Sequence, residues 1–306
     1  MSQTPADRRP LPSRIMRNPW LLLTFSSLVW GGNVVAARFA VGEISPMALV
    51  GLRWVVVSVI ILVFARGRLG TTLASLKPHW AYLLPMGVVG FTMSNAMLYE
   101  GARFTTGLNV SIIQGVLPVL VLAGARVIYG VRAGLVRWIG VAITMAGIIL
   151  IATEGEPARI LDLQINKGDG LVFLGAAIYA AFTLALRKRP PMTAMAFFIG
   201  VAIAALASSV PAMIVEAMLG ATIWPGWRGL LVLLYVAVFT SIIGQVCWIR
   251  AVEIIGPARA GVFQNLVPVV GALLSVLLLR ETFHWHHAAS LGLVLSGLFI
   301  SELGKR

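Results

Sequence analysis

Charged residues are scarce in this sequence of 306 residues, and their scarcity excludes an ordinary soluble protein. Only 11% of the residues are charged and 59% are hydrophobic, whereas soluble domains carry about 25% charged and about 45–50% apolar residues. The net charge of +13 does not indicate nucleic-acid binding. Its Lys and Arg residues stand in short connections between apolar segments, and there is no basic domain with interleaved aromatic residues.

Cysteine and the usual catalytic motifs are also lacking. The one cysteine, Cys247, excludes an intrachain disulfide and is expected to be a small buried residue. The sequence contains no G-x-x-x-x-G-K-[ST] loop, the usual motif for ATP binding, and no H-E-x-x-H helix, the usual motif of zinc proteases. Nothing in it therefore indicates ATP-driven transport or zinc-dependent proteolysis. No nucleophile with a base, and no pair of carboxylates, stands out as an active site. We therefore expect no enzyme and no cofactor.

The sequence does contain apolar segments of roughly 20 residues, the length at which a helix crosses a bilayer. Their apolar character is continuous and does not alternate with period two, which argues against a transmembrane β-barrel. The sequence thus predicts an all-α integral membrane protein with ten transmembrane helices. Their ranges are 20–40, 46–65, 80–99, 105–127, 135–152, 169–187, 193–216, 228–250, 258–279 and 286–303.

The Lys and Arg residues are divided unequally between the two sides that ten spans would create. Of 24 such residues, 17 fall in the tails and even-numbered connections, six in the odd-numbered connections, and Arg53 lies inside a span. Because positive charge accumulates on the cytoplasmic side, both termini are expected there.

The two halves of the chain resemble each other at a shift of about 150 residues. GLNVSIIQGVLPVL begins at Gly107 and PARAGVFQNLVPVV at Pro257. The predicted organisation is a cytoplasmic tail (1–19), a first repeat (20–152), an external linker (153–168) and a second repeat (169–306). Since each repeat has five spans, an odd number, the second should enter the membrane inverted, as in transporters that work by alternating access. The shift aligns Gln114 with Gln264, Pro118 with Pro268 and Gly147 with Gly297.

At these residues the chain resembles the EamA-type branch of the drug/metabolite transporter superfamily, over about residues 20–303. Among its members the chain is most similar to YddG-type amino acid exporters. The resemblance implies ten helices, cytoplasmic termini, a bacterial inner membrane location and export of amino acids or related metabolites. The chain departs from the family pattern at Tyr129-Gly130-Val131-Arg132 and at Ser290. The residues that carry the resemblance are Trp30-Gly31-Gly32-Asn33, Pro46, Arg53, Pro118, Gly140, Gly147, Pro268, Arg280-Glu281 and Gly297.

A matched pair of glutamines and prolines marks the predicted pathway. Pro118 and Pro268 each leave the carbonyl four residues earlier without its helical partner, which is the carbonyl of Gln114 or Gln264. Irregular helix is tolerated in a membrane only against protein or a water-filled cavity. The glutamines either bind a zwitterionic solute or satisfy freed backbone groups.

Other polar and aromatic residues share helix faces inside the spans, where they would line a cavity or bond helix to helix. Gly31 and Gly32 would permit close packing or a kink in the first span, and Pro118 and Pro268 would kink two others. Trp30 could instead be a packing residue, and His79 an interfacial one. Arg53 either ties helices together or attracts a substrate carboxylate. The candidate substrate-binding residues are Trp30, Asn33, His79, Tyr82, Asn95, Tyr99, Gln114, Tyr179, Gln245, Trp248 and Gln264.

Acidic residues are absent from the middle of every predicted span. Proton relays in membranes usually need a buried carboxylate or histidine, so we expect a facilitator without proton coupling. His284-Trp285-His286-His287 could bind zinc, but an interfacial belt is the preferred interpretation, and no metal site is predicted.

The resemblance, together with a cavity of Trp, Tyr and amide side chains that would suit neutral and aromatic amino acids, implies a monomeric exporter of amino acids, with the lipid bilayer and a small-molecule substrate as its partners. A transporter or exchanger of drugs or nucleotide-sugar-type solutes is the alternative, because inverted repeats permit either direction. A membrane-embedded enzyme is the alternative of another class.

Overall fold

The computed structural model describes residues 17–132, 134–156, 166–256, 260 and 262–303. All regular structure in these residues is helical, which confirms the all-α prediction. Parts of four predicted features lie outside the described residues: the cytoplasmic tail up to residue 16, the linker over 157–165, residues 258, 259 and 261 at the start of the ninth span, and the C-terminus from 304.

Each of the ten predicted segments falls on helical structure. The first half contains α2 (Pro19–Phe39), α3 (Pro46–Leu76), η1 (Lys77–His79), α4 (Trp80–Gly87), η2 (Val88–Met93), α5 (Ser94–Gly101), α6 (Gly107–Gln114), α7 (Leu117–Tyr129) and α8 (Leu135–Ala152). The second contains α10 (Lys167–Ala185), η3 (Leu186–Lys188), α11 (Ala194–Met218), α12 (Trp227–Leu234), η4 (Tyr235–Ile243), α13 (Gly244–Ile255), η5 (Val262–Asn265), α15 (Leu266–Leu279) and α16 (Trp285–Leu303).

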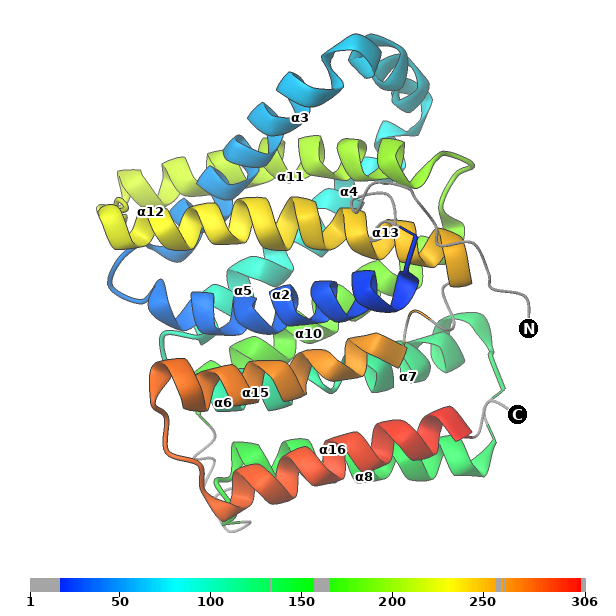
Figure 1. The fold of residues 1–306 in the computed structure, drawn as a ribbon, viewed down its shortest axis with the longest axis vertical. Helices are drawn as coiled ribbons and strands as arrows, with labels where there is room; N and C mark the ends of the chain where they lie inside the picture. Colours follow the sequence, from blue (N-terminus) through cyan, green and yellow to red (C-terminus); the bar gives the residue numbers. More distant parts are fainter. Residues whose placement is uncertain (1–16, 133, 157–165, 257–259, 261, 304–306) are drawn as a thin grey trace, which may run out of the picture.

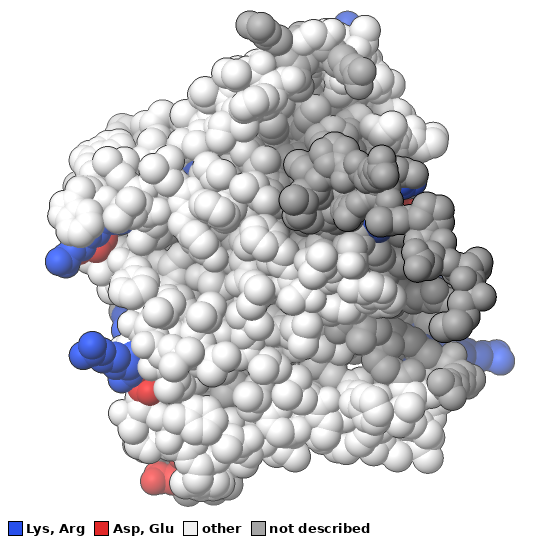
Figure 2. Space-filling model, viewed as in Figure 1, with Lys and Arg blue, Asp and Glu red and all other residues white. Residues whose placement is uncertain are grey.

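Eight helical segments of the described chain are long and apolar enough to cross a membrane. The other two of the predicted ten are not among these eight: Phe263–Leu279 is a shorter apolar helix, and the remaining one is α16. Ten crossings therefore stay a prediction. On the face shown in Figure 2, charged side chains gather at the edges of the molecule, and the broad surface between them is almost free of charge, as a lipid-facing surface should be.

Local sequence explains where the helices begin and end. The Asn18 side chain accepts hydrogen bonds from the backbone N–H groups of Trp20 and Leu21, and Pro19 occupies the first turn of α2, where its missing N–H costs nothing. One helix continues beyond its predicted span. The second span, predicted over 46–65, agrees with the apolar segment Pro46–Phe64, and the helix α3 continues past it to Leu76. The charges at Arg66 and Arg68 mark a membrane exit, whereas a helix ends at a breaker, here the proline that follows Lys77.

The predicted repeat is visible in backbone irregularities that recur about 150 residues apart. Segments of π-helix interrupt the third helical segment at Val88–Met93 and the eighth at Tyr235–Ile243. The helices α7 and α15 both end on a residue in the left-handed conformation, Gly130 with φ 62° and Arg280 with φ 55°. The two halves thus share local geometry as well as sequence.

The contacts between helices also follow the repeat: equivalent helices of the two halves make equivalent contacts. The first helix of one half, α2, packs on α13 and α15 of the other, and its counterpart α10 packs on α5, α6 and α7. Two further contacts join equivalent helices, α3 with α11 and α8 with α16, and Figure 1 shows the α8–α16 pair side by side at one edge of the bundle. The packing is therefore approximately symmetric between the two halves, and the helices of both halves surround one shared centre.

Candidate functional site

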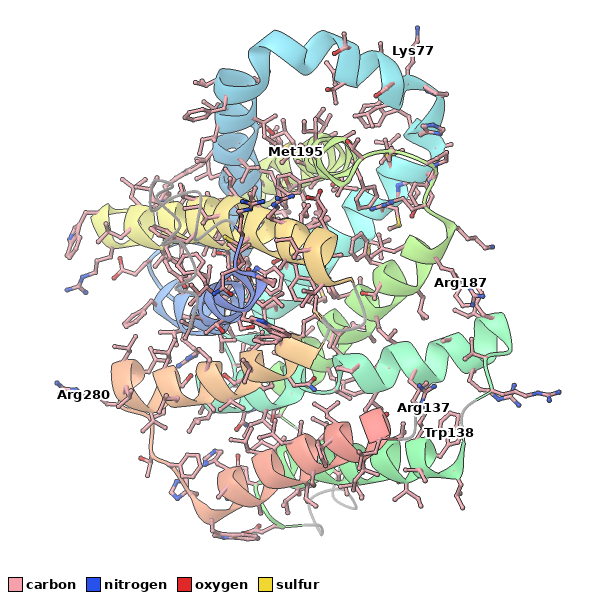
Figure 3. All side chains as sticks on the ribbon, turned by 45° about the vertical axis from the view of Figure 1, so that its right-hand side comes forward. Lys77, Arg137, Trp138, Arg187, Met195 and Arg280 are labelled. Carbon is pink, nitrogen blue, oxygen red and sulfur yellow. The ribbon has the colours of Figure 1, made fainter. Side chains whose placement is uncertain are left out.

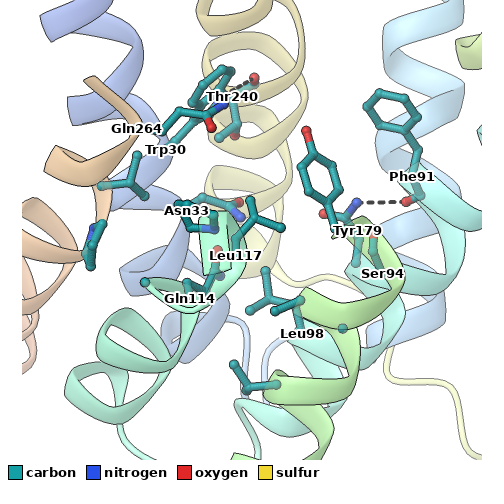
Figure 4. Close-up of a pocket in the computed structure, with 18 of the residues that line it drawn as sticks. Trp30, Asn33, Phe91, Ser94, Leu98, Gln114, Leu117, Tyr179, Thr240 and Gln264 are labelled. Atoms are coloured by element: carbon teal, nitrogen blue, oxygen red, sulfur yellow. Dashed lines mark hydrogen bonds between the residues drawn. The ribbon is translucent and has the colours of Figure 1, made fainter. Parts of the chain in front are cut away.

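A cavity of about 180 Å³ lies at this shared centre, between the two halves. Both halves contribute to its wall, and Figure 4 shows aromatic rings and amide side chains facing the same space. The lining mixes apolar surface with a few polar groups, the usual composition of a small-molecule site. Its predicted members are Trp30, Asn33, Asn95, Gln114, Pro118, Tyr179, Gln245, Gln264 and Pro268.

The central cavity continues into a wider one of about 930 Å³, because Trp30, Tyr179 and Gln264 line both. Trp248, predicted for the site, lines this wider part. Its wall also includes Arg137, which Figure 3 places, with Arg187, at the opposite end of the bundle from Arg280. We refer to the end that carries Arg137 as the mouth and to the end that carries Arg280 as the distal end.

The predicted proline breaks position the glutamines. In the first half, α6 ends at Gln114 and α7 begins at Leu117, one residue before Pro118. In the second half, Gln264 lies in the 3₁₀ turn η5, and Pro268 follows near the start of α15. Each glutamine thus sits where its helix is interrupted, and both line the cavity.

Trp30 forms part of the cavity wall and is held by the other half. Its indole Nε1–H donates to the backbone carbonyl of Thr240 at 3.2 Å, inside the π-helical segment η4. The Trp30 ring lies 5.3 Å from the ring of Trp248. A π-helix leaves backbone groups out of the ordinary i→i−4 pattern, so η4 supplies an acceptor for Trp30.

Arg53 joins several predicted residues into one hydrogen-bonded network. The Arg53 side chain is 6% exposed and lines the central cavity. Its Nε donates to Ser241 Oγ at 2.6 Å, and its Nη1 donates to Asn95 Oδ1 and to the Tyr99 hydroxyl, each at 2.9 Å. The Tyr99 hydroxyl donates in turn to Asn33 Oδ1 at 3.2 Å. Arg53 therefore ties α3 to α5 and η4, and it also faces the cavity.

Three predicted residues do not line either cavity. Tyr99 is buried within the Arg53 network. The Tyr82 hydroxyl donates to the backbone carbonyl of Ala185 at 3.0 Å, so Tyr82 joins α4 to α10. His79 ends the short 3₁₀ turn η1 and is partly exposed.

The glycines of the first span pack closely in place of a kink. The helix α2 continues without interruption from Pro19 to Phe39. A β-carbon on Gly31 would stand 2.6 Å from Val270 Cγ1, and one on Gly32 would collide with the hydroxyl of Tyr235. The two glycines therefore let α2 approach α15 and η4.

Some cavity residues gave no sequence signal. Phe91, Leu117 and Asn265 line both cavities, and Trp54 lines the central one. Phe91 lies in η2, and π-helical segments have no recognisable sequence pattern beyond the nearby Pro85. Trp54 follows Arg53 in an apolar run, where it resembles any packing residue.

Polar contacts join the two halves at the distal end. The Glu281 carboxylate accepts hydrogen bonds from the backbone N–H groups of Gly107 and Leu108, each at 2.8 Å, at the N-terminus of α6. Arg38 lies 3.9 Å from Glu281 and donates to the carbonyl of Ala102. Because Glu281 belongs to the second half and the other partners to the first, these contacts hold the halves together at this end.

No group of three or more His, Cys, Asp or Glu side chains within the described ranges could hold a metal ion. In the histidine cluster, the His284 backbone N–H donates to His287 Nδ1 at 2.9 Å, so one possible ligand atom already has a partner.

Comparisons with known proteins agree with the internal repeat. The model of the EamA-like transporter family matches residues 18–153 and 166–303. The transporter YyaM of Bacillus subtilis is 24% identical over 267 residues, which cover 84% of this chain and 85% of YyaM. The inner membrane transporter YedA of Escherichia coli K12 is 27% identical over 299 residues, 95% of this chain and 94% of YedA. One crystal structure at 17% identity covers 93% of this chain and 97% of its own, with a TM-score of 0.64, and so shares the fold.

Proposed function

The chain belongs to the EamA-like transporter family, and we propose that it exports amino acids, including aromatic and other neutral ones, together with related small metabolites. The carrying observation is the central cavity, which both halves line with equivalent residues. Trp30 and Tyr179 supply apolar walls for a side chain, and Gln114 and Gln264 supply amide donors and acceptors for a zwitterion.

The proposed mechanism is alternating access between two inverted halves. Ten crossings would place both termini on one side of the membrane, and the excess of Lys and Arg in the tails and even-numbered connections would make that side the cytoplasm. The mouth, which carries Arg137 and Arg187 from these connections, would then face the cytoplasm. In this conformation a solute enters from the mouth while the contacts of Glu281 close the distal end. Opening the distal end and closing the mouth would release the solute outside.

We propose transport without proton coupling. Among the described residues that line the two cavities, the one carboxylate is Glu253, which is 3.0 Å from Arg250 and exposed near the mouth. A proton relay would need an ionisable group at the solute site that can exchange its proton. The solute's own gradient then sets the direction.

The test is uptake of radiolabelled amino acids by liposomes that contain the purified protein, at equal pH on both sides. The proposal predicts uptake of phenylalanine, tryptophan and leucine beyond that of protein-free liposomes, and a large loss in a Trp30→Ala variant that still folds. Uptake of none of the amino acids would refute the substrate. Uptake that requires an imposed pH gradient would refute the facilitator mechanism.

A further inference from the structure

The cavity wall carries positively charged side chains in addition to its aromatic and amide groups. Arg53 lines the central cavity, and Arg137 and Arg189 line the wider part toward the mouth. The one carboxylate among the described lining residues, Glu253, is paired with Arg250. A solute that moves inward from the mouth therefore passes cations and reaches another cation at the base.

The charge of Arg53 has no counterion within the described part of the chain. No carboxylate oxygen there lies within the 4 Å of an ion pair. The three hydrogen-bond acceptors of Arg53 are the neutral oxygens of Ser241, Asn95 and Tyr99, and its guanidinium carbon lies 5.4 Å from the centre of the Trp54 ring. A cation inside a membrane protein is costly without a partner, so a partner is expected. A carboxylate brought by the solute would be that partner.

The donors of Arg53 leave room for such a partner. Nε and Nη1 account for the three hydrogen bonds, and no described residue accepts one from Nη2. The indole Nε1–H of the neighbouring Trp54, which also lines the cavity, is buried without a partner. A guanidinium binds a carboxylate through paired N–H groups, an arrangement that a carboxamide cannot match in charge.

We propose that Arg53 binds the carboxylate of the transported solute, so that the cavity selects organic acids and amino acids over neutral compounds of the same shape. This inference rests on the proposed function in naming the group of the substrate that is recognised. The network around Arg53 holds the guanidinium in place before the solute arrives, and the carboxylate then neutralises it.

The experiment compares two ligands of nearly equal shape, 3-phenylpropionate and the neutral 3-phenylpropanamide. Binding to the purified protein is followed by quenching of tryptophan fluorescence, since Trp30 and Trp54 line the cavity. We expect the acid to bind at least about tenfold more tightly than the amide, because a charge-assisted hydrogen bond to the guanidinium is stronger than a neutral one. Equal affinities, or no saturable binding of the acid, would overturn the inference.

Variants of Arg53 distinguish binding of the solute carboxylate from a purely structural role in joining helices. In Arg53→Met the tenfold preference should fall to about one, and Arg53→Lys should retain part of it because the charge stays and the fork is lost. Arg126→Met removes an exposed cation of α7 outside both cavities and should leave the preference unchanged. A preference that survives in Arg53→Met would contradict carboxylate binding.

If Arg53→Met does not fold, the affinities of the wild-type protein and of Arg53→Lys for the acid and the amide still test carboxylate binding. The outcome is also independent of the amino acid uptake test. Failure of uptake would refute the proposed substrates even if the acid binds, and equal binding of acid and amide would refute the role of Arg53 even if amino acids are carried.

Discussion

Single residues show where equivalent positions of the two halves have taken different side chains. Gly130 and Arg280 both cap a helix in the left-handed conformation, and in each case the backbone N–H closes the last turn. Glycine adopts this conformation without a steric penalty, whereas a residue with a β-carbon pays roughly 1 kcal/mol or more. The second half therefore carries strain that the first half avoids.

Replacing Arg280 by glycine should relieve that strain. We expect Arg280→Gly to stabilise the protein by about 1 kcal/mol and to raise its melting temperature in detergent by about 2 °C. Arg280→Ala is the control, because it removes the same exposed charge and keeps a β-carbon. An equal rise in both variants would assign the effect to charge and not to the backbone.

The two glutamines can be tested as a pair that binds solute. If Gln114 and Gln264 bind the substrate, Gln114→Ala and Gln264→Ala should each raise the KM for amino acid uptake by about tenfold or more, the loss of one or two hydrogen bonds. Ser296→Ala removes an exposed hydroxyl outside both cavities and should leave KM unchanged. Normal KM in both glutamine variants would mean that the side chains only satisfy the interrupted backbone.

At the scale of helices, the contact of α8 with α16 depends on small residues. A β-carbon on Gly297 would stand 2.6 Å from the carbonyl oxygen of Gly140 and 2.6 Å from the amide nitrogen of Thr144. Both obstacles are backbone atoms that cannot turn aside. Close approach of helices over glycine compensates for the missing hydrophobic effect between them in lipid.

A leucine at position 297 should force this pair of helices apart. We expect Gly297→Leu to destabilise the protein by about 3 kcal/mol or more, seen as a lower melting temperature or loss of the monodisperse peak in size-exclusion chromatography. Gly292 lies on the same helix with nothing within 4 Å of its β-position, so Gly292→Leu should behave as wild type. Equal loss in both would show that leucine harms α16 in general.

The start of α6 provides a second test at this scale. Its first backbone N–H groups are held by the Glu281 carboxylate, which also suits the positive end of the helix dipole. Glu281→Gln removes the charge, so the amides of Gly107 and Leu108 should exchange with deuterium several-fold faster by mass spectrometry. Glu100→Gln, which breaks only the surface pair with Arg103, should not change that exchange.

Sequence reasoning succeeded for these elements where a residue type has one dominant physical effect. Continuous apolar runs predicted the helices, and Pro118 predicted the interruption beside Gln114. It could not locate η2 and η4, because a π-helical turn depends on packing between helices. From sequence, Arg53 can either tie helices together or attract a carboxylate. Only the tertiary structure shows that Asn95, Tyr99 and Ser241 hold it at the cavity.

For the whole molecule, the shift of 150 residues was enough to predict two similar halves, because duplicated sequence keeps its spacing. The contacts between the halves could not be predicted from sequence, because those of α2 with α15 and of Glu281 with α6 join residues far apart in the chain. Each half packs its first helix on the same elements of the other half, which is the symmetry that the proposed alternating access requires.

Accessibility of one cavity residue from both sides of the membrane tests that account most directly. Leu117 lines both cavities, so a Leu117→Cys variant in a Cys247→Ala background places a single thiol on the pathway. In sealed vesicles, a membrane-impermeant thiol reagent should label this cysteine when added on either side, because the cavity opens alternately. Labelling from one side alone, in the presence and absence of phenylalanine, would contradict a solute pathway between the two halves.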